Sequence, residues 1–272
     1  MLSSILYDKR SKIATLIFAI LTVWWVILRF VDQTNIQYQI FSASYGVIAL
    51  IGAIWGIAIS KKYGGVSSVL GKAILFFSIG LLAQEFGQIV YSAYAFFLRI
   101  QIPYPSLGDI GYFGSIPLYL LGVINVAKAS GIRLSLRNIE SKIKAVIIPF
   151  VILLLGYYLF LQNYSFDWAQ PLKIFLDFGY PLGQAIYVSL AIITYLLSRK
   201  ILGGIMRARI FFIIFALVLQ FLSDYTYLYQ SIHQWAYPGS INDLLYMFAY
   251  YIMTISLLQF DSALKEVHKG SK

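Results

Sequence analysis

The chain has 272 residues, of which 60% are hydrophobic and only 12% are charged, and its mean hydropathy is +0.77. Soluble domains are about half apolar and a quarter charged, so this composition excludes an ordinary soluble enzyme and indicates a protein whose solvent is lipid. The formal net charge of +10 is typical of membrane proteins that expose basic loops to anionic lipid on one side, and no nucleic-acid partner is expected.

The residue types needed for most catalytic and metal centres are scarce. There is no cysteine, and His233 and His268 are the only histidines. Disulfides, thiolate metal sites and cysteine nucleophiles are therefore excluded, and we expect no cofactor and no metal site. The sequence also lacks the Gly-x-Ser-x-Gly, His-Glu-x-x-His and Walker motifs, so no catalytic residue is predicted.

Eight apolar segments follow one another, each long enough for the roughly 20 residues that cross a bilayer. No cleavage site follows the first, which is expected to be a retained span. The pattern predicts an all-α, polytopic membrane bundle with eight spans, at Ile13–Val31, Ile40–Ser60, Leu70–Leu98, Ile110–Ala127, Ile143–Leu161, Ile174–Leu197, Ile210–Tyr229 and Ile241–Phe260.

The basic residues alternate between loops in the way that eight spans require. Of the 21 lysines and arginines, all but Arg29, Arg99 and Lys173 fall before span one, after span eight, or in and at the edges of the loops after spans two, four and six. Basic loops mark the cytoplasmic face. We therefore expect a multi-pass plasma-membrane protein with both termini in the cytoplasm and anionic lipid at the basic face.

Two segments of the chain resemble each other. Residues 104–112 and 237–246 both read Tyr-Pro, then Ser-x-x-Asp-x-x-Tyr, and the segments that begin at Phe76 and Phe211 are alike at a separation of 135 residues. This separation predicts two four-span halves, 1–135 and 136–272, within one membrane domain. Because four is even, both halves enter from the same side and form a parallel repeat.

The repeated serines and aspartates have a structural explanation. Ser106 and Ser240 are suited to cap the helices that follow, with Asp109 and Asp243 three residues later in a capping-box arrangement. Tyr112 and Tyr246 lie one turn deeper, on the same helix face as these aspartates. The alternative to capping is a polar, outward-facing pocket in which phenols and carboxylates satisfy each other.

The same Asp-x-x-Tyr spacing recurs where no cap sequence is present, at Asp177–Tyr180 and Asp224–Tyr227. Interfacial enrichment of tyrosine alone is the alternative explanation. Span three adds Glu85 and Gln88. Glu85 lies about 20 Å along the helix from Lys72 at 1.5 Å per residue, which is past the bilayer midplane. Three explanations of this acid are compatible with the sequence. It forms a hydrogen bond between spans three and seven, its carboxyl group is protonated, or it binds a cation.

The Tyr-Pro-Ser-x-x-Asp-x-x-Tyr segment resembles one in the multispan membrane sensor modules that precede GGDEF or histidine-kinase domains. The matching residues are Pro105, Ser106, Asp109 and Tyr112, repeated as Ser240, Asp243 and Tyr246. Only about a dozen residues follow Phe260, so we expect no output domain after span eight. The resemblance implies a stand-alone membrane sensing module, or a subunit that signals through a protein partner.

Three functions are compatible with this sequence. The leading hypothesis is a non-catalytic sensor or ligand-binding module with an outward-facing acidic and tyrosine-lined pocket. The alternatives are a proton- or cation-coupled transporter and a structural subunit of a membrane complex. The predicted ligand-binding residues are Glu85, Gln88, Asp109, Tyr112, Asp177, Tyr180, Asp224, Tyr227, Asp243 and Tyr246.

Overall fold

The computed structural model describes residues 8–130, 138–198 and 204–270, with side chains omitted at 204–207 and 263–270. In these ranges the secondary structure is helical and contains no strand. The helices are α2 (Lys9–Leu28), α3 (Ile36–Ser44), α4 (Val47–Lys62), η1 (Gly65–Ser67), α5 (Val69–Ser92), η2 (Ala93–Leu98), α6 (Gly108–Ala129), α8 (Ile139–Gly156), η3 (Tyr157–Leu161), α9 (Pro171–Ser198), α10 (Gly204–Ile232) and α11 (Ile241–Gly270).

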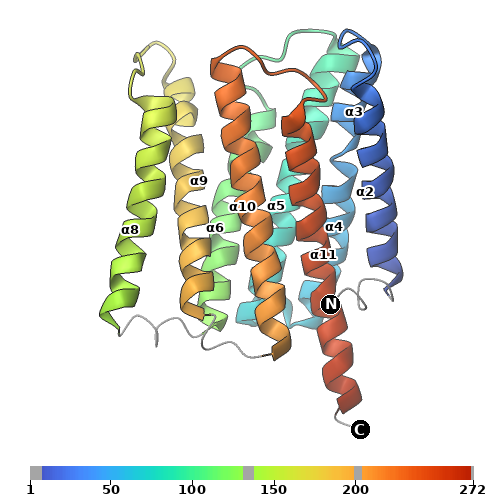
Figure 1. Cartoon of the computed structure of the whole chain (residues 1–272), viewed down its shortest axis with the longest axis vertical. Helices are drawn as coiled ribbons and strands as arrows, with labels where there is room; N and C mark the ends of the chain where they lie inside the picture. Colours follow the sequence, from blue (N-terminus) through green and yellow to red (C-terminus); the bar gives the residue numbers. More distant parts are fainter. Residues whose placement is uncertain (1–7, 131–137, 199–203, 271–272) are drawn as a thin grey trace.

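The described residues form eight helical spans that are long and apolar enough to cross a bilayer, which confirms the predicted bundle. Figure 1 shows the spans side by side, with the start of α2 and the end of α11 at the same end of the bundle. We call this the termini end and the opposite one the distal end. Several basic residues used to predict the cytoplasmic face lie outside the described residues or their side chains: Arg133, Arg137, Arg199, Lys200, Arg207, Lys265, Lys269 and Lys272.

The second span differs from its prediction because it is divided into α3 and α4. The division falls at Tyr45 and Gly46. The amide nitrogen of Gln88 in α5 donates a hydrogen bond to the backbone carbonyl of Ser42, just before the break. A side chain that inserts into the backbone ladder in this way commonly bends a helix.

Close packing in the centre of the bundle depends on glycines between α5 and α6. A Cβ atom added to Gly80 or Gly87 would lie 2.3 Å or 2.8 Å from the ring of Tyr119 or Tyr112, respectively. At Gly111 the added atom would lie 2.3 Å from the backbone carbonyl oxygen of Ala83. Small residues allow helices in lipid to approach closely, where van der Waals packing drives their association.

Helices at the edge of the bundle have faces suited to lipid. α8 buries only Gly156, while Val146, Phe150 and Val151 on its surface are more than half exposed. Figure 1 places α8 at one side of the bundle, where it follows the length of α9. Apolar side chains on such a face are stable when the surroundings are hydrocarbon.

An ion-pair cluster joins three spans at the termini end. Asp261 of α11 is buried and accepts hydrogen bonds from Arg10 of α2 and from Lys62 of α4, whose Nζ atom lies 2.6 Å from the carboxylate. Arg209 of α10 donates from Nε to the carbonyl oxygen of Gln259 at 2.7 Å. These contacts hold the ends of α2, α4 and α10 against α11.

Candidate functional site

The two repeated motifs do begin helices, as the capping interpretation predicts. At α6, a carboxylate oxygen of Asp109 accepts the backbone N–H of Ser106 at 2.7 Å, and the Ser106 hydroxyl accepts the N–H of Gly108 at 3.1 Å. At α11, Asp243 accepts the N–H of Gly239 at 2.7 Å. In both motifs the aspartate satisfies backbone donors that have no partner within the helix.

Each predicted aspartate also accepts a phenol, but this phenol comes from outside the predicted Asp-x-x-Tyr pair. Tyr180 of α9 donates to Asp109 of α6 at 2.7 Å, and Tyr246 of α11 donates to Asp224 of α10 at 2.6 Å. Tyr45, between α3 and α4, donates to Asp243 of α11 at 3.4 Å. The Asp-x-x-Tyr spacing therefore does not produce pairs within one helix, because the long tyrosine side chains cross the gap of about 8–10 Å to a neighbouring helix axis.

Gln88 is the centre of a polar cluster in the distal half of the bundle. Its amide oxygen accepts hydrogen bonds from Tyr112 of α6 at 3.0 Å and from Tyr45 at 3.3 Å. Its nitrogen donates to the carbonyl of Ser42, and the Ser42 hydroxyl donates to Asp243. We call Ser42, Tyr45, Gln88, Tyr112 and Asp243 the central cluster. It connects the break between α3 and α4 with α5, α6 and α11.

Glu85 lies beside this cluster without a partner of its own. Its side chain is buried, with 7% exposure, and its Oε2 atom has no hydrogen-bond partner in the part of the chain that the structure describes. The carboxylate rests on Gly46, where an added Cβ atom would lie only 1.9 Å from Oε2. Among the described residues, no ion pair and no hydrogen bond to α10 involves Glu85, so the predicted bond between spans three and seven is absent.

The neighbouring Gln84 is the residue of α5 that ties spans together. It donates to Ser115 of α6 at 2.7 Å and accepts from Tyr250 of α11 at 3.1 Å. Gln220, which aligns with Glu85 in the second half, donates instead to Asp224 on its own helix at 3.2 Å. Asp224 is thus satisfied by an amide and by the phenol of Tyr246.

Not all predicted site residues converge. Asp177 lies apart, near the distal loop of residues 162–170, where it accepts hydrogen bonds from Tyr104 and Tyr164, both at 2.7 Å. Tyr227 lies beside Tyr91 of α5 rather than beside Asp224. Gln88, Tyr112 and Asp243 share one cluster with Glu85 next to it, while Asp109–Tyr180 and Asp224–Tyr246 are separate pairs.

Five residues of these hydrogen-bond networks were not among the predicted site residues: Ser42, Tyr45, Gln84, Tyr91 and Tyr250. One of these carries a signal in the sequence. Tyr45 precedes Tyr180 by 135 residues, the separation of the similar segments around Phe76 and Phe211, and both tyrosines donate to the aspartate of a capping motif in the other half. Comparing the halves position by position could have paired these tyrosines.

We predict that Tyr164 resists ionisation. Burial and the hydrogen bond to Asp177 raise the pKa of Tyr164 to about 12, and the same causes raise the pKa of Tyr104. A phenol ordinarily ionises near pH 10. The hydrogen bond of Tyr164 therefore contributes fully to the free energy of unfolding below about pH 10, and this contribution is lost as the pH rises from about 10 to 12. Tyrosinate absorbance at about pH 11 should be the same in the wild type and in Tyr164→Phe; a clear decrease in the variant would contradict the assignment.

Comparison of the chain with protein-family models, with curated proteins and with solved structures finds no match. The central cluster, with Glu85 beside it, is therefore the candidate site on geometric grounds alone, within an integral membrane protein of eight spans.

Proposed function

We propose that this protein is a non-catalytic membrane sensor or ligand-binding module, whose ligand reaches the central cluster and Glu85 from the distal, outward-facing end. The observation that carries this proposal is the Oε2 atom of Glu85, which is the one carboxylate oxygen among the eight buried side-chain polar atoms of the described residues that lack a hydrogen-bond partner. A buried polar atom without a partner is rare and costs about 1–3 kcal/mol or more. A ligand that donates to this oxygen would recover that free energy.

The charge around the cluster favours a cationic or hydrogen-bond-donating ligand. Glu85 and Asp243 are buried in the distal half and Asp224 is half-buried there, and none of the three takes part in an ion pair among the described residues. Arg29 is the basic group that acts on Asp243, and it donates its own hydrogen bonds to Tyr237 and to the carbonyl of Gly239. Buried acids without basic partners within a membrane are typical of ligand or ion sites.

The connectivity of the cluster supports a sensing role. Ser42, Gln88, Tyr112 and Asp243 come from four different spans. A ligand that competes for their hydrogen bonds would stabilise one arrangement of these spans over another, and this difference in affinity is what shifts a conformational equilibrium. The resemblance to sensor modules is consistent with this role, either alone or through a protein partner.

Because the chain has no cysteine, single-cysteine variants test outward access directly. Gln88→Cys is expected to react with a membrane-impermeant thiosulfonate added outside intact cells. Ser78→Cys, which is buried in the same helix ten residues closer to the termini end, is expected to remain unmodified. Thr34→Cys in an exposed distal loop should react fully, and Ser67→Cys in η1 at the termini end should not.

The labelling pattern distinguishes the hypotheses. An inert Gln88→Cys next to a reactive Thr34→Cys would mean a sealed core, and the proposed ligand site would be wrong. Modification of Gln88→Cys from both sides, with inside-out vesicles supplying the second side, would support the alternative of a proton- or cation-coupled carrier. That alternative is favoured by the unpartnered Glu85, since carriers use buried acids as coupling groups.

A further inference from the structure

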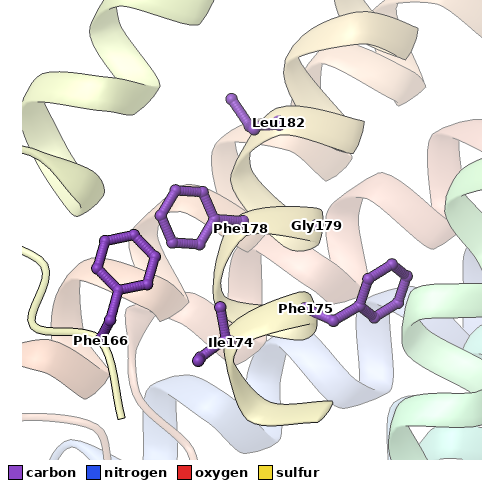
Figure 2. A pocket seen from close by; sticks show the side chains of 6 residues that line it. All are labelled: Phe166, Ile174, Phe175, Phe178, Gly179 and Leu182. Carbon is purple, nitrogen blue, oxygen red and sulfur yellow. The ribbon is translucent and has the colours of Figure 1, made fainter. Parts of the chain in front are cut away.

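A second candidate site lies on the outside of the bundle, at the distal end of α9. An apolar pocket of about 310 Å³ is lined by Phe166, Ile174, Phe175, Phe178, Gly179 and Leu182. Figure 2 shows Phe166 from the loop before α9 and Phe178 from the helix itself facing the same space. Ile174 also borders a polar pocket of about 170 Å³, which contains Lys173, Asp167 and Asp177.

We propose that these adjoining pockets bind one phospholipid with an amine-containing headgroup from the leaflet at the distal end. The apolar pocket takes part of an acyl chain, and the polar pocket takes the headgroup. Position along the helix supports this arrangement. Lys173 lies in the first turn of α9 and Leu182 lies about 14 Å further along at 1.5 Å per residue, so the two pockets extend from the headgroup level into the hydrocarbon.

The aromatic wall is suited to the membrane boundary. Phe166 stacks on Trp168 with ring centroids 5.4 Å apart and on Phe178 at 5.6 Å. Trp168 is 76% exposed, as expected for a tryptophan that anchors at the interface. The pocket lined by Ile174 and Leu182 is apolar, and in a bilayer an acyl chain is the available apolar occupant.

The headgroup chemistry follows from the charges in the polar pocket. Lys173 forms no ion pair among the described residues, although Asp167 and Asp177 line the same pocket. Its ammonium group is free to bind a phosphate. Asp167 accepts the N–H of Ala169 at 3.1 Å and the amide of Gln170 at 2.9 Å, and it retains lone pairs for an N–H donor. One base and two acids match a zwitterion with phosphate and amine better than an anionic lipid.

The proposal is tested with purified full-length protein in dodecyl maltoside, by native mass spectrometry during titration with phosphatidylethanolamine or phosphatidylglycerol. We expect saturable binding of one phosphatidylethanolamine to the wild type. Lys173→Gln and Ile174→Trp, which respectively remove the phosphate partner and fill the apolar pocket, should each weaken it about tenfold or more. Lys173→Arg, which keeps the charge, should bind nearly as well as the wild type.

Matched controls lie on α8. Lys144→Gln removes a lysine from the termini end, where it pairs with Glu140, and Ile147→Trp adds bulk to an exposed apolar face. Both should bind lipid as the wild type does. Equal binding of phosphatidylethanolamine by the wild type, Lys173→Gln and Ile174→Trp would overturn the proposed site. Equal affinity of the wild type for phosphatidylglycerol would overturn the proposed headgroup. Neither outcome bears on the cysteine-labelling test of the central cluster.

Discussion

Replacing Gly111 with alanine is expected to lower the free energy of unfolding by about 3 kcal/mol, because the new methyl group meets backbone rather than a movable side chain. The added Cβ atom would lie 2.3 Å from the carbonyl oxygen of Ala83 and 2.7 Å from the backbone nitrogen of Gly87. Relief of this steric overlap requires α5 and α6 to move apart, and this movement weakens the packing between the two helices.

Gly114, one turn further along the same helix, provides the matched control. A Cβ atom added there meets nothing within 4 Å, so Gly114→Ala should gain helix propensity and raise stability by up to about 1 kcal/mol. Unfolding in mixed micelles of dodecyl maltoside and sodium dodecyl sulfate, followed by circular dichroism, measures both variants. If Gly111→Ala and Gly114→Ala unfold alike, the close approach of α5 to α6 is wrong.

Asp243→Ala is expected to destabilise the protein by about 3 kcal/mol, because the carboxylate has several partners at once. It accepts the Gly239 N–H at the start of α11, the hydroxyl of Ser42 and the phenol of Tyr45. Loss of a helix cap typically costs about 1 kcal/mol, and each buried donor left without an acceptor costs about 1–3 kcal/mol. We expect a loss of stability at the lower end of the sum of these costs, since water can reach some of the freed donors.

Asp32→Ala is the comparison for this prediction. Asp32 lies exposed in a distal loop and accepts from the backbone and hydroxyl of Thr34 at 2.9 Å and 2.8 Å, which lower its pKa. Its loss should leave the unfolding transition near that of the wild type in the same micelle assay. A loss of stability in Asp32→Ala as large as that in Asp243→Ala would show that the cross-helix partners of Asp243 contribute little.

The helical spans could be predicted because each depends on local sequence. A run of about 20 apolar residues must form its backbone hydrogen bonds internally in lipid, and this requirement does not depend on the other spans. The starts of α6 and α11 were predictable for the same reason, since Ser106 with Asp109 and Ser240 with Asp243 act on backbone groups within a few residues. The duplication into two halves remains a prediction.

The partners of the polar side chains could not be predicted in the same way. Tyr112 and Asp109 share a helix face, yet Tyr112 donates to Gln88 and Asp109 accepts from Tyr180. Spacing along one helix determines which face a side chain is on, but the neighbouring helix on that face depends on how all the spans pack. The separate position of Asp177 and the proximity of Glu85 to Gly46 have the same origin.

The sequence by itself therefore determined that the chain is an integral membrane protein of eight helical spans, with acids and tyrosines concentrated toward one end of the bundle, because hydrophobic length and capping are local properties. Only the tertiary structure decided that the Oε2 atom of Glu85 lacks a hydrogen-bond partner among the described residues, that the central cluster joins four spans, and that the distal end of α9 borders two pockets. These features depend on contacts between residues far apart in the chain, and the glycine-mediated approach of the helices fixes which of those contacts form.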